Sequence, residues 1–154
     1  MRAYRLFAAA IVGVGVATMS TGVPAQDAPT GIVGLRQATM KTLGAHMGAL
    51  KAILTDQTEM VDQVPMHARA IGDVAGHIPV LFPEGSTDPE SDALPAIWED
   101  KADFDSHAEK LSELVAALAE TAEGGDVQAS LAAFGQMGKE GCGGCHETYR
   151  KKDS

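Results

Sequence analysis

Apolar residues recur at steps of three and four along four stretches of this chain, a pattern typical of amphipathic helices. The first stretch covers about residues 31–55 and carries Met40, Leu43, Met47, Leu50 and Leu54 on one stripe. The others cover about residues 63–78, 95–122 and 126–150. No alternating strand pattern competes with these stripes. The sequence therefore predicts an all-α protein.

Turn and capping residues separate the four stretches. Thr30 and Asp126 are placed to cap the first and fourth helices. The segment 81–95 is dense in Pro, Gly, Ser and acidic residues and predicts a long loop. A loop of this length in a small domain usually packs on something or covers a site. Short links on either side of one longer loop predict an antiparallel four-helix bundle with up-down-up-down topology.

The first 25 residues have the pattern of a secretory signal peptide. Arg2 and Arg5 precede an apolar run from Leu6 to Val16, and small residues end at Ala25. The apolar run is short for a membrane span, so cleavage before Gln26 is expected rather than an uncleaved anchor. Residues 26–154 would then form one exported domain, and the predicted location is the periplasm.

The net charge is acidic and limits the classes of partner. It is −9 for the whole chain, and loss of Arg2 and Arg5 with the leader would make it −11. Such a protein is not expected to bind nucleic acid non-specifically. An acidic surface could favour a basic redox partner, or it could serve solubility alone.

The two cysteines of the chain lie in one motif, Cys142-Gly-Gly-Cys145-His146. A C-x-x-C-H string is typical of covalent haem attachment. On a helix the two thiols would lie on one face about one turn apart, which suits the two vinyl groups on one edge of a porphyrin. The histidine that follows would reach the iron through a neutral imidazole nitrogen. The sequence thus predicts one haem c near the C-terminal end of the fourth helix.

Three other interpretations of the cysteine pair are weaker. A thioredoxin-like couple would be expected at a helix start in a βαβ context. A structural zinc site needs four ligands, and the motif supplies three. A disulfide across three residues would close a very small loop and stabilise little.

Helix topology predicts which residues face the motif. In an antiparallel bundle the start of the first helix lies beside the end of the fourth. At about 1.5 Å of rise per residue, Arg36, Gln37 and Met40 fall at the depth of Cys142 to His146. We therefore expect a haem wedged between these helices, with His146 on one side and Met40 on the other.

Several motifs taken together resemble one family. They are R-Q-x-x-M-K at residues 36–41, F-P-x-G at 82–85, I-W-x-D at 97–100 and the terminal C-x-x-C-H-x-x-Y-R. In this order they resemble the class II c-type cytochromes, most closely the cytochrome c′ family, over essentially all of residues 26–154. C-x-x-C-H is shared by all c-type cytochromes, so its place at the end of a four-helix chain carries the class assignment.

The resemblance implies a role for each motif residue. Cys142 and Cys145 would be the thioether attachment points and His146 the proximal axial ligand. Arg150 would lie near the proximal imidazole and tune it, although a cation at a helix end is an equally good interpretation.

The first-helix residues follow the same resemblance. Arg36 and Gln37 would contact haem, with the guanidinium near a propionate. They could also form an exposed polar face. Met40 would either crowd the distal side or coordinate iron through sulfur, and Met47 is expected to lie deeper than the haem.

Other candidate residues are expected to be structural. Phe82 and Trp98 could shield the haem edge, but filling the core is the commoner role of a lone aromatic. His46, His67, His77 and His107 are expected at surface or core-edge positions, without a partner at metal-ligand spacing.

Two functions compete within the resemblance. The favoured one is a five-coordinate haem c that binds NO or CO and exchanges electrons. The alternative is a low-spin, six-coordinate electron carrier with Met40 as the sixth ligand. An enzyme such as a peroxidase would need a distal acid–base pair, and none is evident, so no catalytic residue is expected. The expected partners are a small redox protein or a membrane electron-transport complex, a diatomic gas and a second copy of the chain.

Overall fold

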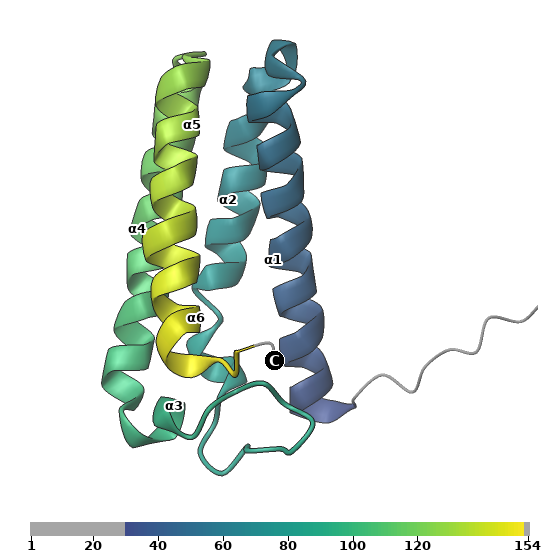
Figure 1. Ribbon diagram of the computed structural model, residues 1–154, viewed down its shortest axis with the longest axis vertical. Coiled ribbons are helices and arrows are strands. Elements are labelled where there is room, and N and C mark those ends of the chain that lie inside the picture. Colours follow the sequence, from purple (N-terminus) through teal and green to yellow (C-terminus); the bar gives the residue numbers. More distant parts are fainter. Residues whose placement is uncertain (1–29, 153–154) are drawn as a thin grey trace, which may run out of the picture.

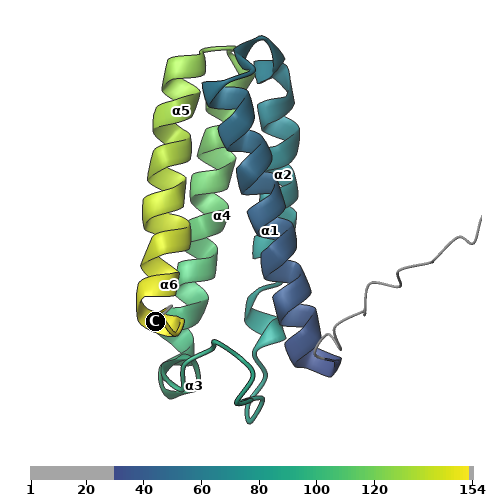
Figure 2. The ribbon, with the colours of Figure 1, turned by 45° about the vertical axis from the view of Figure 1, so that its right-hand side comes forward.

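The computed structural model describes residues 30–152, and the predicted signal peptide lies outside these residues. Four long helical segments run alternately up and down, as Figures 1 and 2 show. They are α1 (Gly31–Thr55), α2 (Val64–Ala75), α4 (Lys101–Glu123) and a fourth segment that starts with α5 (Val127–Gln136). The predicted all-α, antiparallel four-helix bundle is confirmed. None of the helices within residues 30–152 is both long and apolar enough to cross a membrane.

The first two helices follow the prediction closely. The bounds of α1 match the predicted 31–55, but Thr30 caps it only through its backbone carbonyl, which accepts from the Gly34 N–H at 3.4 Å. The helix predicted at 63–78 is shorter. A 3₁₀ segment, η1 (Thr58–Gln63), leads into α2, and a second one, η2 (Pro79–Leu81), follows it. Pro65 lies in the first turn of α2, where a missing N–H costs no helical hydrogen bond.

The helix predicted at 95–122 is broken at Asp100. This residue adopts φ −134° and ψ 71°, which separates the short α3 (Ala96–Glu99) from α4. Its carboxylate accepts the Asp103 backbone N–H at 3.1 Å, so it caps α4. The break at Asp100 is local, and the spacing of apolar residues in 95–122 did not predict it. Asp126 caps α5 as predicted, accepting from the Ala129 N–H at 3.0 Å.

The fourth segment is continuous but not uniform. After α5 the helix widens into a π-helical stretch, η3 (Met137–Gly143), and then returns to α-geometry in α6 (Gly144–Tyr149). A Cβ on Gly141 would lie 2.8 Å from Leu111 Cδ1, so glycine allows η3 to lie directly on α4. Arg150 is extended rather than helical, which corrects the predicted helix end.

The loop of residues 82–95 closes one end of the bundle, as predicted for a loop that covers a site. It pairs with the chain that leaves α6: the Leu94 N–H donates to Tyr149 O at 2.9 Å, and the Lys151 N–H donates to Asp92 O at 2.8 Å. Ala93 and Arg150 form an isolated antiparallel bridge. This end also contains the start of α1 (Figure 1). A cavity lies here, so we call it the cavity end.

The opposite end is packed with side chains. It contains the last turns of α1 and α4 and the first turns of α2. Its fully buried residues are Leu50, Leu54, Val64, Ile71, Val115 and Leu118. We call it the closed end. The hydrophobic core continues from here into the cavity end, where Ile97 and Phe104 are also buried.

Candidate haem site

A cavity of about 680 Å³ lies at the cavity end. Residues of α1 form one wall, η3 and α6 form another, and α4 contributes Phe104, His107 and Leu111. Its volume falls within the range of about 300–1,000 Å³ that is common for ligand pockets. The cavity lies where the helix topology predicted a haem.

The two cysteines line this cavity and form no disulfide with each other. Cys142 is near the end of η3 and Cys145 is in the first turn of α6, so the motif spans the junction of π- and α-geometry. Burial raises the pKa of Cys142. Burial, then the charges of Cys142 and Asp103, raise the pKa of Cys145 to about 11.

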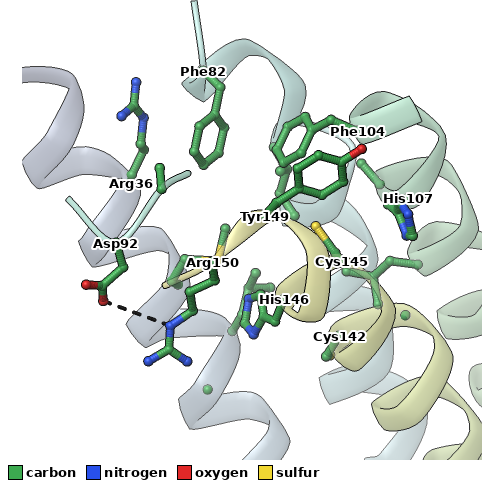
Figure 3. Close-up of a pocket in the computed structure, with 18 of the residues that line it drawn as sticks. Arg36, Phe82, Asp92, Phe104, His107, Cys142, Cys145, His146, Tyr149 and Arg150 are labelled. Carbon is green, nitrogen blue, oxygen red and sulfur yellow. Dashed lines mark ion pairs between the residues drawn. The ribbon is translucent and has the colours of Figure 1, made fainter. Parts of the chain in front are cut away.

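His146 lines the cavity and is solvent-exposed, and it lies on the same short helix as Cys145 (Figure 3). Desolvation by the surrounding protein, then the charge of Arg150, lower the pKa of His146. A lowered pKa favours the neutral imidazole, which is the form that binds a metal.

Arg150 lies beside His146, as the resemblance implied. Its Nε is 3.9 Å from Asp92 Oδ2, an ion pair that Figure 3 marks between the loop and the end of α6. Its backbone N–H donates to His146 O at 3.3 Å. The extended chain after α6 thus holds this guanidinium next to the imidazole and the loop.

Arg36 lines the cavity but is 3 % exposed, so it is not part of an exposed polar face. Its Nε donates to Leu81 O at 2.5 Å, and its Nη1 donates to Ser86 O at 2.9 Å. Its Nη2 also donates to the Ser86 hydroxyl. Three of its five N–H groups therefore bind the loop, and two are left for another acceptor. The guanidinium lies 4.5 Å above the Phe82 ring centroid.

Gln37 and the two methionines of α1 also line the cavity. The Gln37 side-chain amide donates to Glu90 O at 3.4 Å. Met40 and Met47 are half-buried and both lie on the cavity wall. Gly44 lies between them, and a Cβ there would have no atom within 4 Å. This part of α1 therefore presents an apolar wall with free space in front of it.

The two aromatic residues differ in position, since only Phe82 is among the residues that line the cavity. Phe82 is 6 % exposed within the core and also lines the cavity. Trp98 is half-buried, and its Nε1 donates to Pro83 O at 2.8 Å, which ties α3 to the loop.

The structure adds a group of residues that the sequence did not single out as functional. The Tyr149 hydroxyl donates to Asp103 Oδ2 at 2.5 Å, and His107 Nε2 is 3.6 Å from the same oxygen. Tyr149 is 4 % exposed and makes edge contacts with Phe104 and His107. Burial, then the hydrogen bond to Asp103, raise the pKa of Tyr149 to about 12. This cluster fixes α6, and with it Cys145 and His146, against α4.

One expectation about the other histidines was wrong, because two of them have each other as partners. His107 is half-buried, as expected of a core-edge residue, and it lines the cavity on the side of the cysteine motif: a Cβ on Gly144 would lie 3.6 Å from its Nδ1. His46 and His67 are partners, with their Nδ1 atoms 3.0 Å apart. His77 is exposed as expected, lies in the turn that follows α2, and contacts Asp73 O in that helix.

The residues fit a covalently attached haem. Two thiols and an imidazole share one wall, apolar residues of α1 form the other, and the volume between them is open. Among the residues that the structure describes, no group of three His, Cys, Asp or Glu could hold a metal ion by itself. The thioredoxin context is also missing from this part of the chain, which contains helices and loops and a single isolated bridge.

A family model described as Cytochrome C′ matches residues 31–150. The chain belongs to the cytochrome c′ family. As proteins of this family do, it carries one covalently bound haem c, and the cysteine pair in the cavity is the only one in the chain.

Individual relatives agree over nearly their whole length. A cytochrome c′ from Pararhodospirillum photometricum is 33% identical over 124 residues, which are 80% of this chain and 98% of the relative. A cytochrome c-556 from Agrobacterium tumefaciens (strain B2A) is 38% identical over 124 residues, 79% of this chain and 98% of the relative.

Solved structures share the fold. One is a cytochrome c′ described as having ligand-controlled dimer dissociation. It has a TM-score of 0.71 and 28% identity, and the match covers 79% of this chain and 95% of that one. Another is a nitric oxide complex of a variant cytochrome c prime from Alcaligenes xylosoxidans. It has a TM-score of 0.68 and 26% identity, over 79% and 94% of the two chains.

Proposed function

We propose that this family member holds a five-coordinate haem c that binds NO or CO and exchanges electrons in the periplasm. The observation that carries the proposal is the cavity, which joins Cys142, Cys145 and His146 to an apolar wall of α1. When bound, the haem supplies a redox-active iron with one position for a diatomic ligand.

The cysteine motif would attach and orient the group. Cys142 and Cys145 would form the two thioether bonds, and His146 would be the proximal ligand through a neutral imidazole nitrogen. The lowered pKa of His146 supports that role. Arg150 would keep a positive charge beside the imidazole, held by Asp92.

The distal side would be formed by Met40, Leu43 and Met47, which share the α1 wall of the cavity. The thioether and aliphatic groups of these three residues offer no N–H or O–H donor to a bound ligand. Such a wall suits NO and CO, whereas a bound oxygen molecule would gain no hydrogen bond from it.

Arg36 would serve the loop first and the haem second. Its bonds to Leu81 O and Ser86 keep the guanidinium in place. The two remaining N–H groups could donate to a propionate. Gln37, bonded to Glu90 O, would border the same edge of the haem.

The second candidate function is a six-coordinate electron carrier. Met40 and His146 line one cavity from different helices, which favours a methionine ligand more than either position alone would. Thioether ligation would favour ferrous iron and raise the reduction potential.

Optical spectra of the haem-loaded protein, oxidised and reduced, with and without carbon monoxide, distinguish the two functions. Broad high-spin bands and ready carbon monoxide binding are expected. Met40→Ala should then leave the spin state unchanged, as should the matched control Met47→Ala. Sharp low-spin bands that resist carbon monoxide and turn high-spin only in Met40→Ala would establish the electron carrier instead.

The location and the partners belong to the same proposal. We expect cleavage before Gln26, which the mass of the mature protein would test directly. A small redox protein or a membrane electron-transport complex would exchange electrons with the haem. A second copy of the chain is a further expected partner, supported by the dimer named for one structural neighbour. Native mass spectrometry with and without carbon monoxide would test it.

A further inference from the structure

Two histidines from different helices meet outside the haem cavity. His46 of α1 and His67 of α2 place their Nδ1 atoms 3.0 Å apart, with ring centroids separated by 5.3 Å and the rings tilted by 59°. Both side chains are partly buried, so solvent can reach them. Neither residue lines the cavity. The pair is therefore separate from the haem site.

The protonation of the pair follows from its geometry. Two ring nitrogens at hydrogen-bond distance require one N–H donor and one lone pair, so at least one imidazole is neutral. Burial, then the charge of His46, lower the pKa of His67. A pair with lone pairs available at neutral pH can accept a metal ion in place of the shared proton.

We propose that His46 and His67 form a two-imidazole binding site for Cu²⁺. Metal–imidazole bonds are about 2.0–2.1 Å long, so two nitrogens at a right angle around one ion lie about 2.9 Å apart, and two at the tetrahedral angle about 3.3 Å. The observed 3.0 Å is close to the right-angled separation. The 5.3 Å between the ring centroids shows that the two rings now face each other end to end, as in a hydrogen bond, so both side chains would have to turn for their Nδ1 lone pairs to meet at one ion. Tetragonal nitrogen ligation is preferred by Cu²⁺, which also binds such sites more tightly than the other divalent ions of its series.

The rest of the coordination shell is open. Among residues 30–152 no third His, Cys, Asp or Glu completes a metal-binding group, so water would occupy the remaining positions. On binding, the proton between the two Nδ1 atoms moves to the Nε2 of its own ring. Both rings then carry Nε2–H, each Nδ1 lone pair faces the ion, and no net proton is released from a neutral pair. The bound ion would link α1 to α2 through two residues that are 21 positions apart in the sequence.

Titration of the oxidised, haem-loaded protein with a copper(II) salt tests the site. Isothermal titration calorimetry should show one ion per chain, and the electron paramagnetic resonance spectrum of Cu²⁺ should show coupling to two imidazole nitrogens. Loss of a residue that is only hydrogen-bonded to a metal ligand weakens metal binding about 10- to 100-fold. Loss of a ligand itself should cost no less, so His46→Ala and His67→Ala should each weaken Cu²⁺ binding at least tenfold. Cu²⁺ should also raise the thermal midpoint of the native protein but not of these variants.

His77→Ala is the matched control. His77 is an exposed imidazole in the turn after α2 whose Nδ1 contacts Asp73 O, so this variant should bind Cu²⁺ as the native protein does. Binding with unchanged affinity in His46→Ala and His67→Ala would overturn the proposal, since the ion would then sit elsewhere, for example at the chain's amino group. If a variant fails to fold, the native spectrum still decides: coupling to fewer than two imidazole nitrogens overturns the site.

Discussion

At the closed end of the bundle Leu50, Leu54 and Leu118 are completely buried, whereas at the cavity end Met40 and Leu43 remain half-exposed on a cavity wall. The same apolar stripe of α1 supplies residues to both ends. The stripe therefore predicts which face of a helix turns inward. It does not predict whether side chains or a cofactor fill the space on that side.

The two ends are also held together differently. The closed end depends on apolar side chains that fill the space between the helices. The cavity end has open space there, so polar contacts fix its parts: Arg36 bonds to the loop, and Tyr149 bonds to Asp103. Backbone bonds between the loop and the chain after α6 add to them. An end built to hold a large group cannot rely on contacts among its own side chains alone.

The largest expected effect is on the free energy of unfolding, which a substitution at the closed end should lower more than one at the cavity end. Leu118→Ala removes a fully buried side chain and should lower the free energy of unfolding by about 2–5 kcal/mol. Leu43→Ala, on the cavity wall, should cost no more than about 2 kcal/mol and should instead alter the haem spectrum or carbon monoxide binding. Denaturant unfolding of the haem-loaded proteins, with their optical spectra, measures both. Equal losses with unchanged spectra would show that the division between the ends is wrong.

Two helical glycines sharpen the comparison. Gly141→Ala would place a Cβ 2.8 Å from Leu111 Cδ1 and should destabilise the protein by about 1–3 kcal/mol. Gly48→Ala meets no atom within 4 Å on an exposed part of α1, so it should stabilise by about 0.5–1 kcal/mol. Thermal and denaturant unfolding would compare them. A stable Gly141→Ala protein would mean that η3 does not lie tightly on α4.

The polar contacts of the cavity end predict a smaller loss. Tyr149→Phe removes the hydrogen bond to the half-exposed Asp103 carboxylate and should cost about 1–2 kcal/mol. Asp103→Asn keeps an acceptor and should cost less. Unfolding monitored by both circular dichroism and haem absorbance measures the two variants. The bond is not important for the fold if Tyr149→Phe is as stable as the native chain.

The same hydrogen bond also predicts a pH dependence of the stability. The pKa of Tyr149 is raised to about 12, from about 10 in an unfolded chain. Between these values the folded state binds more protons than the unfolded state, so the stabilisation is full below about pH 10 and is lost as the pH rises toward 12. Tyr149 is the only tyrosine of residues 26–154, so ultraviolet phenolate absorption reports it alone. A midpoint near that of free tyrosine would contradict the buried bond, and Asp103→Asn should shift the midpoint in that direction.

The sequence alone determined the fold class, the bounds of α1, the cap at Asp126 and the place of the cysteine motif beside the start of α1. All of these follow from local patterns: residues three or four apart on a helix, a capping side chain, or one short motif in an antiparallel order. The haem-contact roles of the motif residues remain predictions.

Only the tertiary structure decided the rest. Arg36 bonds to a loop 45 to 50 residues away, Tyr149 to a carboxylate 46 residues away, and His46 to a ring 21 residues away. No local spacing encodes such pairs, because they depend on how four helices and a loop come together in space. The π-helical turn at Gly141 and the extended Arg150 have the same origin: the first follows from close contact with α4, and the second from pairing with the loop.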